Sequence, residues 1–197
     1  TIDDYADWTA ALFQSLNISK NGSKGVSVFS NGFGGFVSLG LCLRHPKLVS
    51  HLVIANSGGA FSEERKIPLY GMSQKVMSDG LDAILDIAMS RMFPEDFRQA
   101  NPEIILERKT KLLSADAEQF AKACEALSKL NYLSKANNIQ CDVDIIAGML
   151  DETTPPSMSY ELYKQINQAT YHQIEDSGHC PQIQQPKKLL SLITKIL

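Results

Sequence analysis

The chain has 197 residues, 44% of them hydrophobic, and 19 basic against 22 acidic residues give it a net charge of −3 at neutral pH. These values are typical of one globular domain and exclude a broad basic face for nucleic acid. No apolar run approaches the roughly 18 residues of a membrane span, and nothing resembles a signal peptide, so we expect neither a membrane nor a nucleic-acid partner.

The first predicted element is an amphipathic helix at the start of the chain. Residues 1–4, Thr-Ile-Asp-Asp, can cap its N-terminus. Apolar residues then recur at helical spacing and predict one buried face. That face consists of Tyr5, Trp8, Leu12, Phe13 and Leu16.

Residues 25–46, GVSVFSNGFGGFVSLGLCLRHP, form the stretch around which the rest of the chain is organised. The apolar run 26–29 predicts a buried strand, a turn of small residues follows, and a helical pattern then stops at Pro46. This order builds either a phosphate-binding loop or the nucleophile elbow of a hydrolase. The phosphate fingerprint G-x-G-x-x-G fails, because Val37 stands where its third glycine belongs and the next apolar run ends in Asn56 rather than in an acidic ribose ligand.

The turn SNGFGG resembles the nucleophile elbow of the α/β-hydrolase superfamily. In that register Gly32 occupies the nucleophile position, where the family normally has serine, and the backbone N–H of Phe33 is one of the two oxyanion-hole donors. Small residues at 30, 34 and 35 suit the close approach of strand and helix, and a His-Pro pair follows at the family's usual offset. Ser30 is the nearby rival nucleophile, but that register would place Val28 where a small residue is required.

Downstream, strand and helix patterns alternate around a long helical stretch. Apolar runs predict strands at residues 52–55, 143–147 and 171–174, and helical patterns occupy residues 71–78, 81–93, 102–113, 117–130, 157–167 and 187–197. The order implies right-handed crossovers and a mostly parallel sheet, hence an α/β fold. In the superfamily that the chain resembles, an all-helical insert of this kind is a cap. We therefore predict an α/β-hydrolase core of residues 1–61 and 139–197 and a helical cap of residues 62–138.

Methionine and phenylalanine side chains of the predicted cap are candidates for a substrate pocket beneath it. The candidates are Met72, Met89, Met92 and Phe93. Packing of helix against helix is the alternative for each of them, since methionine often fills cores.

Two loops after the late strands resemble the acid and histidine loops of the superfamily. In GMLDETTPP, Asp151 would orient the histidine, with Glu152 and Asp144 as weaker candidates and a turn or helix-cap aspartate as the alternative. In SGHCP, His179 would act as general base and then general acid. The chain order of elbow, acid and histidine is the one this fold uses. The histidines at 45, 51 and 172 lack such settings, and we interpret them as structural or exposed.

Cysteine and histidine usage indicates reduced thiols and no metal centre. The four cysteines, at positions 42, 124, 141 and 180, show no paired C-x-x-C spacing. Reduced thiols are typical of the cytoplasm, where we expect the protein. The four histidines lack the spacing of metal ligands, and we predict neither a metal nor another cofactor.

Residues 93–156 look most like 3-oxoadipate enol-lactonases and related small carbon–carbon or ester hydrolases. The resemblance implies a small-molecule ester or lactone-like ligand. Glycine at position 32 supplies neither oxygen nor sulfur for covalent catalysis, so we expect a hydrolase-related protein that is inactive or severely impaired. Two alternatives stay open: a non-catalytic ligand-binding or signalling module, and a weak hydrolase in which His179 and Asp151 activate a water.

The superfamily also has strands and an oxyanion-hole loop before the helix that opens this chain. Without a partner on its outer side, the strand at 26–29 would present an apolar edge, which is an aggregation hazard. We therefore expect that edge to be covered by an upstream segment, on the same polypeptide or as a separate chain, or by self-association.

Overall fold

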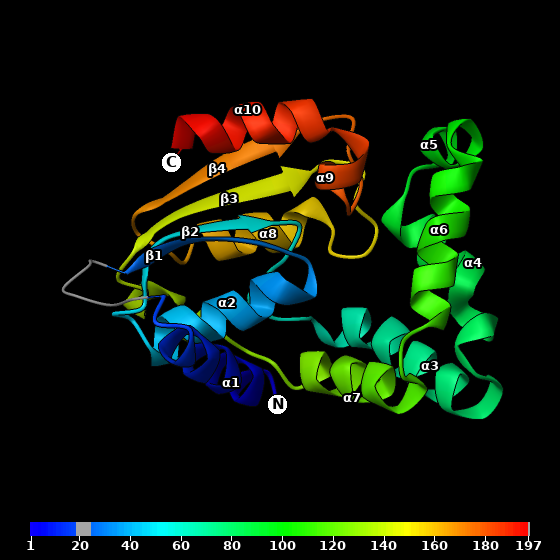
Figure 1. Ribbon diagram of the computed structural model, residues 1–197, viewed down its shortest axis with the longest axis horizontal. Helices are drawn as coiled ribbons and strands as arrows, with labels where there is room; N and C mark the ends of the chain where they lie inside the picture. The colour runs from blue at the N-terminus through cyan, green and yellow to red at the C-terminus, as the bar shows by residue number, and fades with distance from the viewer. Residues whose placement is uncertain (19–24, 197) are drawn as a thin grey trace.

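The computed structural model describes residues 1–18 and 25–196, and its centre is a parallel β-sheet. The described strands run in the order β1-β2-β3-β4, and each neighbouring pair is parallel. Their bounds are β1 (Val26–Asn31), β2 (Val49–Ala55), β3 (Asp142–Gly148) and β4 (Ala169–Ile174). Parallel pairing brings the carboxyl ends of all four strands to one edge of the sheet (Figure 1). The predicted α/β class and mostly parallel sheet are confirmed.

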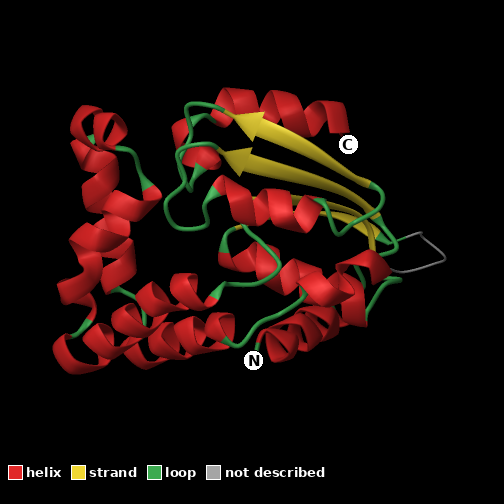
Figure 2. Cartoon of the chain, turned by 180° about the vertical axis from the view of Figure 1, so that it is seen from behind, coloured by secondary structure: helices red, strands yellow, loops and turns green. Residues whose placement is uncertain are grey.

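Helices cover both faces of the sheet (Figures 1 and 2). α10 (Pro186–Ile196) packs on one face, α2 (Phe33–Arg44) and α8 (Pro156–Tyr163) pack on the other, and α1 (Ile2–Ser15) lies against α2. The remaining helical elements are α3 (Glu63–Asp79), η1 (Leu81–Ile84), α4 (Leu85–Met92), α5 (Glu95–Ala100), α6 (Pro102–Leu113), α7 (Ala117–Ser128), η2 (Leu133–Asn138) and α9 (Pro181–Gln184).

The two central strands are buried on both faces, as their continuous apolar runs predict. Leu52 and Ile54 of β2 face the cluster shared with α1, α2 and α8, whereas Val53 and Ala55 face Leu189 of α10. All five side chains are buried. Burying a large apolar side chain stabilises a fold by about 1.5–3 kcal/mol. The loops at the carboxyl edge therefore start from a tightly packed sheet.

α1 begins as predicted but buries a different face. Thr1 Oγ1 accepts a hydrogen bond from Asp4 N at 3.2 Å, which closes the predicted cap. The prediction that this apolar face is buried is wrong for three of its residues. Their exposed fractions are 73% for Trp8, 45% for Leu12 and 60% for Leu16. The helix instead buries Ile2, Ala6 and Ala10. α2 comes so close that a Cβ at Gly40 would lie 3.0 Å from Ala6 Cβ, and only small side chains fit between the helices.

A run of helices, α3 to α7, joins β2 to β3. α6 has the predicted bounds, Pro102–Leu113. α3 begins at Glu63 rather than at Gly71, because Ser62 caps its first turn and Pro68 removes only one helical hydrogen bond. The helix predicted over residues 81–93 is divided in two. Its first turn is the 3-10 helix η1, and α4 follows it directly.

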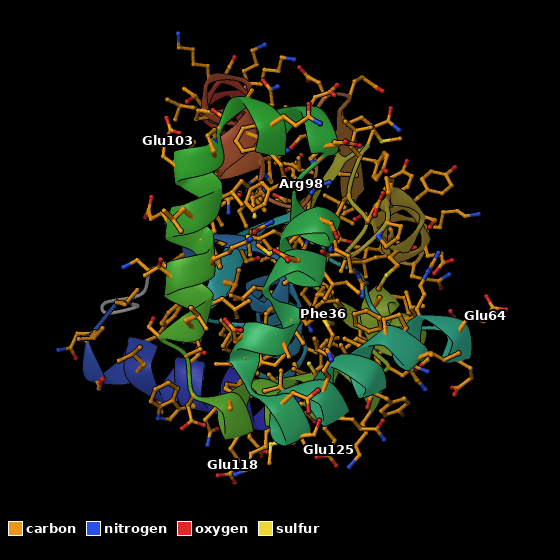
Figure 3. All side chains as sticks on the ribbon, turned by 90° about the vertical axis from the view of Figure 1, so that its right-hand side faces the viewer. Phe36, Glu64, Arg98, Glu103, Glu118 and Glu125 are labelled. Carbon is orange, nitrogen blue, oxygen red and sulfur yellow. The ribbon has the colours of Figure 1, made fainter. Side chains whose placement is uncertain are left out.

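These helices stand partly in front of the sheet's carboxyl edge. Figure 3 looks onto them from that side and shows α4 and α6 between the viewer and the core. The division into a core of residues 1–61 and 139–197 and a cap of residues 62–138 stays a prediction. Within residues 1–18 and 25–196, no helix combines the length and the apolar character needed to cross a bilayer.

Candidate active site

The elbow lies at the junction of β1 and α2. Gly32 has φ +54° and ψ −121°, and the next residue, Phe33, opens α2. These angles match the first central residue of a type II′ turn, a conformation that favours glycine. The turn is fixed by hydrogen bonds from Gly32 N to Ala55 O (3.1 Å) and from Gly35 N to Gly32 O (2.9 Å). The predicted strand, tight turn and helix are therefore all present. The strand is not buried as predicted, because β1 lies at the edge of the described sheet and none of its residues is fully buried.

Close packing explains the glycine at position 35, whereas a Cβ at Gly34 would make only an ordinary 3.8 Å contact with Ser30 Cβ. A Cβ at Gly35 would lie 2.5 Å from Ser57 Cβ, so no larger residue fits there. Ser30 Oγ lies 2.8 Å from Ser38 Oγ and 3.4 Å from the carbonyl oxygen of Val53. These partners engage the hydroxyl between α2 and β2, which speaks against Ser30 as the nucleophile.

The imidazole of His179 faces Gly32. An added Cβ at Gly32 would lie 2.7 Å from His179 Nε2 and 3.2 Å from Cε1. On the other side of the ring, Nδ1 lies 2.8 Å from Asp151 Oδ2. Both side chains are buried, and the backbone N–H of His179 donates to Met92 O at 2.9 Å. Residues 32, 179 and 151 thus lie side by side, with the histidine between the elbow glycine and the aspartate, as the sequence predicts.

The carboxylate of Asp151 is held on both oxygens. Oδ1 accepts hydrogen bonds from the backbone N–H groups of Thr153 (2.7 Å) and Thr154 (3.0 Å). Oδ2 lies 2.9 Å from Thr154 Oγ1 and faces His179 Nδ1. An ionised carboxylate can only accept, so Nδ1 carries the hydrogen and the lone pair of a neutral imidazole sits on Nε2, toward Gly32.

Asn56 joins the acid loop to the histidine loop, and sequence reasoning missed this function. The residue is buried at the end of β2 with φ +51°. Its Nδ2 donates to Gly178 O at 2.6 Å, and its Oδ1 accepts from Gly148 N at 2.9 Å. The available signal is a polar residue, Asn56, directly after the buried strand at 52–55.

The predicted pocket residues lie in two places. Met72 of α3 packs against the main core, whereas Met89 and Phe93 are buried in a cluster with Cys180, next to His179. Met92 packs against that cluster, and its carbonyl accepts the hydrogen bond from His179 N. Their role in substrate binding stays a prediction.

The proposed oxyanion donor belongs to the first turn of α2. The backbone N–H of Phe33 lies in that turn, where helical N–H groups have no partner within the helix. The ring of Phe33 packs edge-on against Tyr5, with centroids 5.3 Å apart. The ring thus serves the core, and the oxyanion role of the N–H stays a prediction.

Asp144 and the other three histidines are engaged elsewhere, whereas Glu152 is exposed. Asp144, in the middle of β3, lies 2.7 Å from His51 Nε2 and 2.6 Å from His172 Nε2, so it bridges the neighbouring strands. His45 Nε2 lies 2.8 Å from Asp7 Oδ1, between α2 and α1. These contacts agree with a structural interpretation of the three histidines.

Among the described residues, neither a cluster of metal ligands nor a substitute nucleophile lies near this site. Within the described ranges, no group of three His, Cys, Asp or Glu side chains is arranged to hold a metal ion. Cys180 lies beside His179, but burial raises the pKa of its thiol to about 12. A thiol that stays protonated at neutral pH is a poor nucleophile.

Comparison with known proteins identifies the family. The family model described as alpha/beta hydrolase fold matches residues 1–186. The chain belongs to the α/β-hydrolase fold family. It is 24% identical over 194 residues to 3-oxoadipate enol-lactonase 1 of Acinetobacter baylyi, which covers 98% of the chain and 70% of that relative.

Solved structures of α/β hydrolases superimpose closely on this fold. The enol-lactonase from Burkholderia xenovorans LB400 aligns with a TM-score of 0.89 and 21% identity, over 99% of this chain and 72% of that one. A thermophilic esterase from Thermogutta terrifontis aligns with a TM-score of 0.87 and 21% identity, over 100% and 71% of the two chains. At this level of identity the superposition shows the fold alone. The family match and the identity to the Acinetobacter enzyme make the chain an α/β hydrolase related to enol-lactonases.

Proposed function

We propose that this α/β hydrolase keeps the ligand site and the His–Asp pair of a carboxylic-ester or enol-lactone hydrolase but is inactive or severely impaired in acyl-enzyme chemistry. One observation carries the proposal: His179 Nε2 faces the point where the side chain of residue 32 would begin, at 2.7 Å, and residue 32 is glycine. A base and its orienting carboxylate are in place, and the group that they would activate is absent.

The size of the loss follows from the role of the nucleophile. Covalent acyl transfer needs an oxygen or sulfur within hydrogen-bond reach of the imidazole. Removing the serine from a working triad lowers turnover by about 10⁶-fold. Ser30 does not replace it, because its hydroxyl is hydrogen-bonded between α2 and β2. Cys180 does not replace it either, because burial raises the pKa of its thiol.

Two alternatives use the same site without a covalent intermediate. In the first, the chain is a ligand-binding or signalling module for a small ester or lactone-like molecule. In the second, His179 and Asp151 activate a water for slow hydrolysis. This water would donate a hydrogen bond to His179 Nε2, the ring nitrogen that faces Gly32.

Hydrolysis of p-nitrophenyl acetate and of an enol-lactone tests the proposal. We expect negligible turnover by the native chain and measurable turnover by Gly32→Ser, with an acyl-enzyme detectable by mass spectrometry after quenching. Weak turnover by the native chain that is lost in His179→Gln would indicate water activation. A folded Gly32→Ser variant without turnover would favour the binding module.

A further inference from the structure

Two cysteines that are far apart in the sequence meet in the core. Cys42 lies in the last turn of α2, and Cys141 directly precedes β3, 99 positions further along the chain. Their Sγ atoms are 3.7 Å apart, and both residues belong to the cluster that packs against the sheet on the α2 side. All four cysteines carry free thiols, and among the described residues this is the pair whose sulfurs touch.

A short movement would join the two sulfurs. A disulfide has an S–S bond of about 2.0 Å, so the gap of 3.7 Å must shorten by about 1.7 Å. The backbone around Cys141 is held in place, because Gln168 Nε2 donates hydrogen bonds to Cys141 O at 2.8 Å and to Ile139 O at 2.9 Å. The reduced protein thus keeps the two thiols facing each other at short range.

The two thiols differ in exposure and in acidity. Cys141 lies in the loop between η2 and β3, flanked by the exposed residues Gln140 and Asp142. Its exposed fraction is 8%, against 2% for Cys42. The hydrogen bond between the thiols lowers the pKa of Cys141 and raises that of Cys42, where burial adds to the rise. Reactive cysteines combine a depressed pKa with access from solvent and a neighbouring thiol. Cys141 is therefore the thiol that an oxidant meets first.

We propose that Cys42 and Cys141 are a peroxide-sensitive modification site, which closes to a disulfide and reopens in a thiol reductant. The Cys141 thiolate attacks one oxygen of hydrogen peroxide: the S–O bond forms, the O–O bond breaks, and the leaving hydroxide takes up a proton to become water. The Cys42 sulfur gives up its proton and attacks the resulting sulfenic acid, so that the S–S bond forms, the S–O bond breaks and a second water leaves. The two thiols lose two electrons, and the peroxide gains them.

The disulfide would close a loop that contains β2 and the helices from α3 to α7. α2 begins at the elbow with Phe33, and β3 ends at Gly148, three residues before Asp151. The bond therefore ties together the far ends of two elements that lead to the candidate active site. A cross-link between residues so far apart restricts the unfolded chain strongly, and we expect the melting temperature to rise by roughly 4–16 °C. The inference is independent of the function proposed above.

Thiol counting and peptide mapping on the native chain test the inference. The folded protein is treated with hydrogen peroxide, then unfolded and alkylated with iodoacetamide. We expect four alkylated cysteines before treatment and two after it, with a disulfide between the tryptic peptides that carry Cys42 and Cys141. The melting temperature should rise in parallel, and dithiothreitol should reverse both changes. Cys124→Ala is the matched control and should form the cross-link as the native chain does.

The variant Cys42→Ala separates the two steps. It should accumulate a sulfenic acid at Cys141, detected by dimedone labelling, with no rise in melting temperature. Three results would each overturn the inference: four alkylated cysteines after treatment, a disulfide that involves Cys124 or Cys180, or a cross-linked chain no more stable than the reduced one. The mapping on the native chain decides the matter even where Cys42→Ala does not fold. No step measures turnover, so the outcome does not depend on whether Gly32→Ser is active.

Discussion

The substitution Gly32→Ser changes both the chemistry and the stability of this chain. It keeps a backbone with φ +54° and adds a Cβ 2.7 Å from His179 Nε2. A non-glycine residue in such a sparsely populated conformation costs about 1–3 kcal/mol. The imidazole must also move by a fraction of an ångström, although Asp151 holds Nδ1 at 2.8 Å and Met92 O holds the backbone N–H at 2.9 Å. For a chain of this length we expect the melting temperature to fall by about 2–12 °C.

The same substitution should create activity. We expect kcat/KM for p-nitrophenyl acetate to rise at least about 100-fold, but by less than the ~10⁶ that a triad serine contributes, because the displaced imidazole is not ideally placed. Gly32→Ala is the matched control: it has the same backbone strain and the same Cβ contact without a hydroxyl. It should lose comparable stability and gain no turnover.

Two results would refute this reasoning. A Gly32→Ala chain as stable as the native one would contradict the close approach of His179 and the turn geometry. A Gly32→Ser chain that is folded, with the expected drop in melting temperature, yet turns over neither ester nor lactone would mean that the His–Asp pair is not poised as a base toward residue 32.

Three further predictions address the support of the site and the sheet. Asn56→Ala leaves Gly178 O and Gly148 N without their buried partner, so unfolding in urea should show a loss of about 2–5 kcal/mol, whereas the exposed Asn137→Ala should change little. Burial, then the hydrogen bond to Asp3, raises the pKa of Tyr132 above its usual 10.0. Above pH 10 the tyrosine of the unfolded chain ionises before that of the folded chain, so the free energy of unfolding should be unaffected below pH 10 and should fall above it. The Tyr132→Phe variant lacks this group, and its free energy of unfolding should fall less steeply with pH. Identical slopes for the two proteins would contradict this. β1 is an edge strand of the described sheet and exposes 40% of Phe29, so we propose that an upstream segment or a second copy covers it. A strict monomer of this chain at all micromolar concentrations in light scattering would count against that proposal.

The sequence determines the elements of the site and their order. Apolar runs predict the strands, and small residues at 30, 34 and 35 predict a turn in which strand and helix nearly touch. The loops around Asp151 and His179 follow the late strands, and parallel pairing must bring such loops to one edge. These inferences hold because they depend on local sterics and on the period of hydrophobic residues.

Other features are decided only by tertiary packing. Helical spacing gives α1 a large apolar face, yet Ala6 turns inward because Gly40 allows α2 to come too close for Trp8 to fit. The role of Asn56 depends on which two loops meet beside it. Spacing along the chain predicts which residues share a face. Only the assembled fold decides which face meets a partner and which polar group is left without one.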